Sequence, residues 1–153
     1  MNKKVFGRKL SRSRPAREAL FASLAQSLIK NGSIITTRAK AKAVIGSVEK
    51  MVTLAKKGGV SAQRKVMSNL DNKREATEVL FHKVVKAFSN KNSGFIRLIS
   101  LPRRVGDNAQ MVKMEWTEKV EYETAKKPEV KAKKEEVKKE VKKVVKKEVI
   151  SKK

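Results

Sequence analysis

The first seventeen residues of this 153-residue chain carry seven cations and no acid, and Val5, Phe6 and Leu10 are their only large apolar side chains. A segment of this composition cannot build a hydrophobic core of its own, so the sequence predicts an extended arm. Its like charges repel one another until a polyanion neutralises them. Lys and Arg gain affinity for a phosphate backbone by displacing its counterions. The predicted nucleic-acid-binding cations of the arm are Lys3, Lys4, Arg8, Lys9, Arg12, Arg14 and Arg17.

The excess of positive charge extends through the whole chain. It contains 39 Lys and Arg against 15 Asp and Glu, a formal net charge of +24. Residues 125–153 hold 13 Lys and 5 Glu, and the middle of the chain keeps an excess of about +9. A folded domain with this charge repels itself, and a bound polyanion relieves the repulsion. The alternative for the arm is a solvated extension that only keeps the chain soluble.

Roughly a hundred residues between arm and tail suffice for one domain with one core. The chain has no cysteine, which excludes disulfides, Cys-ligated zinc and thiol catalysis and fits a reducing compartment. The apolar stretches are short and amphipathic, and no apolar segment follows the N-terminal charges. We therefore expect neither a membrane span nor a secretory signal, and a cytoplasmic protein.

Helical spacing of apolar residues predicts four helices. The first starts at Ser13-Pro15 and stops at Asn31-Gly32, and the second follows Thr37 and stops at Gly58-Gly59. The third spans residues 61–70. Asp71 or Asn72 is expected to cap the fourth, which runs to Phe88.

Short segments rich in β-forming residues predict a small sheet. Residues 95–101 and 111–116 read as an antiparallel hairpin with a long basic loop, in which Val112, Met114 and Trp116 share one face. Residues 33–37 read as a strand or extended link that adds a third strand. The fold class predicted is α+β, with about four helices packed on a sheet of two to three strands.

Composition divides the chain into a basic arm at residues 1–14, an α+β domain at 15–120 and a charged tail at 121–153. From residue 125 onward the tail consists mostly of Lys, Val, Glu and Ala, and we expect it to be disordered in isolation. It is interpreted as a solubilising extension, with weak contact to a polyanion or an anionic membrane as the alternative.

The sequence offers no convergent catalytic set. His82 is the only histidine and falls in a predicted helix, so it is interpreted as a surface imidazole; a catalytic or metal-binding role would need further groups at fixed spacing. Asp107 is interpreted as a turn residue. No phosphate-binding loop or dinucleotide fingerprint is present, and no cofactor or metal is expected.

Further basic residues extend the candidate nucleic-acid interface beyond the arm. Arg38 and Lys42 share a face at the start of the second helix while Lys40 is turned away, and a solvated helix surface competes equally with a binding role. Arg97 interrupts an apolar strand, and Arg103 and Arg104 begin the hairpin loop. A basic loop and a basic arm would give one nucleic acid two points of approach. Phe6 is a candidate for stacking on a base.

An ordered series of short motifs runs through residues 3 to 117. It comprises Gly7-Arg8-Lys9-Leu10, Arg12, Ala19-Leu20-Phe21, Ser27-Leu28-Ile29-Lys30-Asn31-Gly32, Ile34-Ile35-Thr36-Thr37-Arg38-Ala39-Lys40-Ala41-Lys42, Leu54-Ala55-Lys56, Gly94-Phe95-Ile96-Arg97, Arg104, Gly106-Asp107, Ala109 and Met111. In order and spacing this series resembles the bacterial large-subunit ribosomal protein seventeen family. The chain departs from the family pattern at Ala16, Ala22 and Ser23.

The resemblance implies a non-catalytic structural constituent of the large ribosomal subunit. It implies an α+β body near the peptide exit tunnel, an N-terminal extension against ribosomal RNA, and neighbouring ribosomal proteins as partners. The predicted location is the cytoplasm, bound to the ribosome. The alternatives are a DNA-compacting or regulatory protein, for which no recognition helix or dimer device is visible, and an RNA-processing enzyme, for which the catalytic set is missing.

Overall fold

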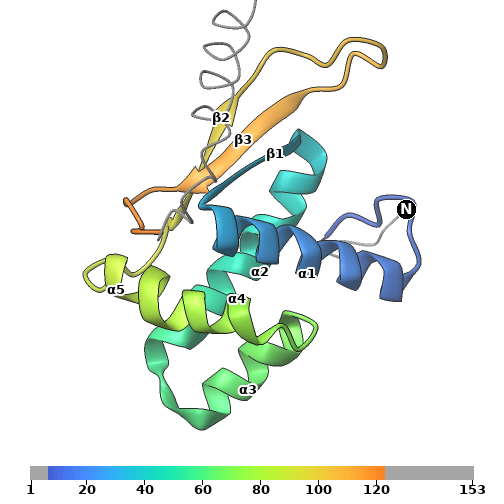
Figure 1. The fold of residues 1–153 in the computed structure, drawn as a ribbon. Helices are drawn as coiled ribbons and strands as arrows, with labels where there is room; N and C mark the ends of the chain where they lie inside the picture. The colour runs from blue at the N-terminus through green and yellow to red at the C-terminus, as the bar shows by residue number, and fades with distance from the viewer. Residues whose placement is uncertain (1–6, 123–153) are drawn as a thin grey trace, which may run out of the picture. The chain divides into compact units, whose positions relative to one another are not determined.

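A computed structural model describes residues 7–122 of the chain. Along the sequence it contains helix α1 (Arg14–Asn31), strand β1 (Ser33–Thr37), helix α2 (Arg38–Lys57), helix α3 (Gly59–Asn69), a helical stretch described below, and strands β2 (Ile96–Ser100) and β3 (Met111–Trp116). Figure 1 shows the helices on one side of the sheet. The predicted α+β class is confirmed.

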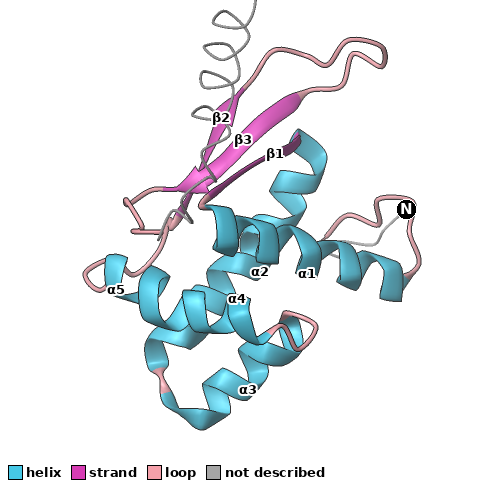
Figure 2. Cartoon of the chain, viewed as in Figure 1, coloured by secondary structure: helices cyan, strands magenta, loops and turns pink. Residues whose placement is uncertain are grey.

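The stretch after α3 is helical but not uniform. It consists of α4 (Arg74–Val79), a wider π-helical turn η1 (Leu80–Val84) and α5 (Val85–Ala87), which together form the fourth helix predicted (Figure 2). A π-helical turn accommodates one extra residue inside a helix. The sequence pattern had not indicated it.

The sheet has the strand order β1-β3-β2, and both pairings are antiparallel. The predicted hairpin of β2 and β3 is therefore confirmed, and β1 joins it on the free side of β3. Alternation along β3 buries Val112, Met114 and Trp116 against the helices and leaves Lys113 and Glu115 on the outer face.

The core lies between the helices and the inner face of the sheet. Phe88 is fully buried there, with its ring 5.2 Å from that of Phe95 and 5.8 Å from that of Trp116. Phe21 and Phe81 are partly buried against it. The aromatic residues of the body thus serve packing.

The cap predicted for the fourth helix is wrong. Asp71 and Asn72 both have positive φ, 48° and 57°, and Lys73 occupies the cap position. Asp and Asn tolerate the left-handed region better than most residues, so here they turn the chain after α3. The backbone N–H of Asn72 donates to the carbonyl of Met67 at 2.9 Å, which closes this turn.

The ends predicted for the first two helices are confirmed, whereas the third, predicted at residues 61–70, spans Gly59–Asn69. Ser13 and Thr37 occupy the cap positions of α1 and α2, with Pro15 in the first turn of α1. Gly32 closes α1 in the left-handed conformation, at φ 76°. Among the described helices, none is both long enough and apolar enough to cross a membrane. Of the predicted tail at residues 121–153, residues 123–153 lie outside the described residues.

Candidate nucleic-acid interface

A cleft of about 400 Å³ lies where the arm, the first turn of α2 and the end of the β2–β3 loop meet. It is lined by Arg8, Thr37, Arg38, Ala39, Lys42, Ala109 and Gln110. Figure 1 shows these three segments on the same side of the body. The structure thus brings Arg8, a predicted cation of the arm, together with Arg38 and Lys42, two predicted cations at the start of α2.

Strand register explains how α2 and the loop meet. Thr37 pairs with Met111 across β1 and β3, so the next residues along, Arg38 and Gln110, also face each other. The backbone N–H of Arg38 donates to the Gln110 carbonyl at 2.9 Å, and its Nη1 donates to Gln110 Oε1 at 3.3 Å. Because this partner is neutral, the guanidinium keeps its full charge for an anion.

Gln110 was not a predicted site residue. Its position follows from extending the β1–β3 register by one pair beyond Thr37 and Met111. Composition gives no signal for it, since a glutamine beside a turn is unremarkable. A sequence analysis that had fixed the register would have placed it beside Arg38.

The described part of the arm approaches the cleft through a turn. Leu10 and Ser11 have positive φ of 52°, and the backbone N–H of Arg12 donates to the Lys9 carbonyl at 3.1 Å. Arg12 Nη1 also donates to the Leu10 carbonyl at 3.0 Å. This turn connects the cleft-lining Arg8 to the start of α1. Lys3, Lys4 and Phe6 lie outside the described residues.

On α2 the two predicted faces separate as expected from helical spacing. Arg38 and Lys42 line the cleft, whereas Lys40 does not. Within residues 7–122, neither Lys42 nor Arg8 makes an ion pair or a side-chain hydrogen bond, and the same holds for the exposed Lys9 and for Lys40. These cations remain available to a partner.

Other predicted cations are already paired with acids. Arg14 Nε lies 2.9 Å from Glu18 Oε1, a hydrogen-bonded pair that raises the pKa of Arg14 above its ordinary value. Arg104 Nη2 lies 2.6 Å from Asp107 Oδ2. Arg17 donates to the Arg12 carbonyl at 3.4 Å. The acid-paired cations contribute less net charge to an interface than their number suggests.

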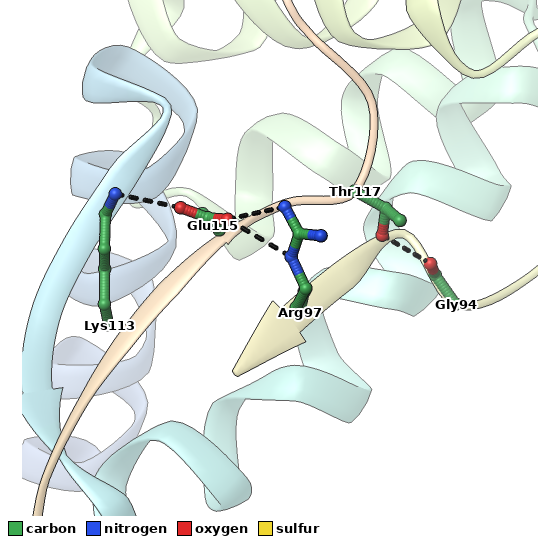
Figure 3. Close-up of polar contacts among 5 residues, drawn as sticks. All are labelled: Gly94, Arg97, Lys113, Glu115 and Thr117. Carbon is green, nitrogen blue, oxygen red and sulfur yellow. Dashed lines mark hydrogen bonds and ion pairs between the residues drawn. The ribbon is translucent and has the colours of Figure 1, made fainter. Parts of the chain in front are cut away.

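Arg97 belongs to an ion-pair network on the outer face of the sheet (Figure 3). Its Nη2 lies 2.7 Å from Glu115 Oε1, and Lys113 Nζ lies 2.9 Å from the other oxygen of the same carboxylate. Hydrogen bonds from Lys113 and then Arg97 hold the pKa of Glu115 below its ordinary value. Arg97 therefore has a structural role of its own, since it connects β2 to β3 through Glu115.

The β2–β3 loop is built around Asp107. Its Oδ1 accepts from Arg104 Nε and from the backbone N–H of Ala109, both at 3.2 Å, which makes it the turn residue expected from the sequence. These hydrogen bonds, that from Arg104 foremost, lower the pKa of Asp107 to about 2. Arg103 and Val105 are exposed beside this turn, Val105 to 98%. The loop presents Arg103 without an acid partner among the described residues.

The described residues give no support to catalysis. His82 is exposed on η1, as its interpretation as a surface imidazole requires. Between residues 7 and 122 no group of three or more His, Asp or Glu side chains could hold a metal ion. What the cleft offers chemically is positive charge from Arg8, Arg38 and Lys42 with no acid among the residues that line it.

Comparisons with known proteins identify the family to which this chain is similar. Residues 20–117 match the family model described as ribosomal protein L17. The chain is similar to the large ribosomal subunit protein bL17 of Persephonella marina, at 42% identity over 77% of this chain and 96% of the relative. It is also similar to the proteins of that name from Rhodopseudomonas palustris, at 39% over 74% and 84%, and Agrobacterium fabrum, at 37% over 74% and 79%.

Proposed function

Because the chain belongs to the ribosomal protein L17 family, we propose that it binds ribosomal RNA and stabilises its packing near the peptide exit tunnel. Membership makes it a structural constituent of the large ribosomal subunit and not an enzyme. Its proposed partners are large-subunit ribosomal RNA and neighbouring ribosomal proteins, and its proposed location is the ribosome in the cytoplasm.

One observation carries the RNA-binding proposal. Arg8 from the arm and Arg38 and Lys42 from the start of α2 line one cleft, and none of the residues that line this cleft is acidic. Lys9 and Arg103 add unpaired charge on the arm and the loop. Three other predicted cations, Arg14, Arg104 and Arg97, are partly neutralised by Glu18, Asp107 and Glu115, so the cleft offers a polyanion more net charge than these paired positions do.

The mechanism follows from charge neutralisation. RNA segments that repel one another can approach if cations lie between them, and the arm at residues 1–14 would order as it binds. Recognition would depend on RNA shape, because the described body presents no aromatic stacking surface; its aromatic residues are buried or half-buried in the core. The remaining predicted contacts are Lys3, Lys4, Arg12, Arg14, Arg17, Lys40, Arg97 and Arg104.

The salt dependence of binding to large-subunit RNA tests the proposal. Deleting residues 1–12 removes five cations and keeps α1 with its cap residue Ser13, so the log–log slope should become shallower by up to about 4.5. Deleting residues 123–153 removes 13 Lys and six Glu, a larger net charge of +7, and is the control, for which we nevertheless expect a smaller change in slope. Specific RNA binding through the arm would be refuted if the two deletions changed the slope equally, or if the chain bound duplex DNA as tightly as large-subunit RNA.

A further inference from the structure

The cleft between the arm, α2 and the β2–β3 loop has the features of a site for a single anion. Arg8, Arg38 and Lys42 converge on it, and none of the residues that line it is acidic. The first turn of α2 also contains no acid. Cations held together without a counterion repel one another, so an anion in the cleft would relieve that repulsion.

The geometry of Arg38 is preset for such an anion. Two hydrogen bonds tie it to Gln110, one through its backbone N–H at 2.9 Å and one through Nη1 at 3.3 Å. A neutral acceptor orients the guanidinium without cancelling its charge. The remaining N–H groups of the fork are suited to the paired oxygens of a phosphate, and Lys42, one helical turn further on, adds a point charge.

The size of the cleft limits what it can take. At about 400 Å³ it lies near the lower end of ligand sites, which span roughly 300–1,000 Å³. Thr37, Ala39 and Ala109 contribute small side chains to its walls. A phosphate with part of its sugar fits this space, whereas three separate phosphates of a duplex, each on its own cation, would need a wider surface.

We propose that this cleft clamps one phosphodiester group of ribosomal RNA, so that the arm, the start of α2 and the β2–β3 loop hold the same nucleotide. The inference rests on the proposed RNA binding and adds where and how one contact is made. It assigns Arg8, Arg38 and Lys42 to one phosphate in place of three. Gln110 is then a positioning residue, because it orients Arg38 and does not itself contact the phosphate.

The number of phosphates can be counted from the salt dependence of RNA binding by the full chain. If Arg8, Arg38 and Lys42 share one phosphate, the triple alanine variant should lower the log–log slope by about 0.9; three separate phosphates would lower it by about 2.7. The matched control is the triple alanine variant of Lys57, Arg64 and Lys65, three exposed cations at the far end of α2 and on α3. It removes the same charge and should leave the slope unchanged.

The measured change in slope distinguishes one shared phosphate from three separate ones. A fall near 0.9 with an unchanged control supports the clamp; a fall near 2.7, or none, overturns it while leaving RNA binding in place. Failure of the wild-type chain to bind large-subunit RNA would overturn the proposed function itself. Circular dichroism of each variant verifies that it is folded.

Nuclear magnetic resonance of the 15N-labelled full chain identifies the source of the anion. Large-subunit RNA fragments should shift the backbone amide signals of Ala39 and Lys42, and should displace any inorganic phosphate that shifts them first. Inorganic phosphate that RNA cannot displace would overturn the clamp in favour of a free-phosphate site. A poly-glutamate peptide that shifts these signals when RNA does not would overturn it in favour of a protein carboxylate.

Discussion

Gly32, which ends α1, is predicted to be the glycine of the described body least able to accept a side chain. Its φ is 76°, and a Cβ atom there would lie 2.6 Å from Cε2 of Tyr122. Tyr122 is not free to move away, because its hydroxyl accepts a hydrogen bond from Trp116 Nε1 at 2.8 Å. Burial raises the pKa of Tyr122 to about 12, and the hydrogen bond with Trp116 has a smaller, opposite effect on it.

The cost of Gly32→Ala has two parts. The left-handed conformation costs a residue with a Cβ roughly 1–2 kcal/mol. Displacing the Tyr122 ring breaks its hydrogen bond with Trp116, worth about 1 kcal/mol. The two together predict that the free energy of unfolding falls by about 2–3 kcal/mol.

Urea unfolding followed by circular dichroism measures this loss, and two further variants separate its causes. In a Tyr122→Ala background the ring is gone, so Gly32→Ala should cost only the conformational part, about 1–2 kcal/mol. Gly46→Ala is the matched control, because Gly46 lies inside α2 with no atom within 4 Å of the added Cβ. It should stabilise the protein by about 0.5–1 kcal/mol. A Gly32→Ala cost below 1 kcal/mol would refute the conformational cost, and equal costs in both backgrounds would refute the clash with Tyr122.

Three further predictions concern other parts of the body. The pKa of Asp107 is lowered to about 2, so the turn that this carboxylate holds should be intact above the ordinary pKa of 3.8 and should loosen as the pH falls toward 2. Arg104→Gln removes the main cause of this lowering and should move the titration of Asp107, followed by NMR, to higher pH. Phe88→Ala, in the centre of the core, should lower the free energy of unfolding by about 3–5 kcal/mol in urea titrations. Lys56→Met removes hydrogen bonds to two loop carbonyls at 2.6 and 3.2 Å and should cost about 1–3 kcal/mol by thermal unfolding, whereas the exposed Lys57→Met should cost little.

Much of the fold could be predicted from local sequence because the signals for its elements are local. Glycine at the end of α1 and the pair Gly58-Gly59 after α2 indicate helix ends through backbone conformations that other residues avoid. Alternation along β3 correctly assigns its buried face. The cap predicted for α4 was wrong because aspartate is favoured both at helix caps and in left-handed turns, and Asp71 adopts the second. The hydrogen bond that closes this turn joins Asn72 to Met67, which a helix-cap pattern does not include.

The candidate interface was less accessible to prediction. Charge identifies Arg38, Arg97 and Arg104 equally, yet Arg97 and Arg104 are partly neutralised by acids and Arg38 is not. Which cation finds an acid depends on strand register and on loop conformation, neither of which composition encodes. The meeting of Arg8 with Lys42 depends in addition on a turn in the arm, formed by two residues with positive φ.

Ultraviolet cross-linking of intact large ribosomal subunits, followed by mass spectrometry of peptide–RNA adducts, tests the central claim most directly. We expect the chain to be present in these subunits and its adducts to fall within residues 1–17, 38–42 and 97–110. We expect none on α3. Absence of the chain from large subunits would contradict its role as a constituent of them. Adducts confined to α3 and the tail would contradict RNA binding through the arm, the start of α2 and the β2–β3 loop.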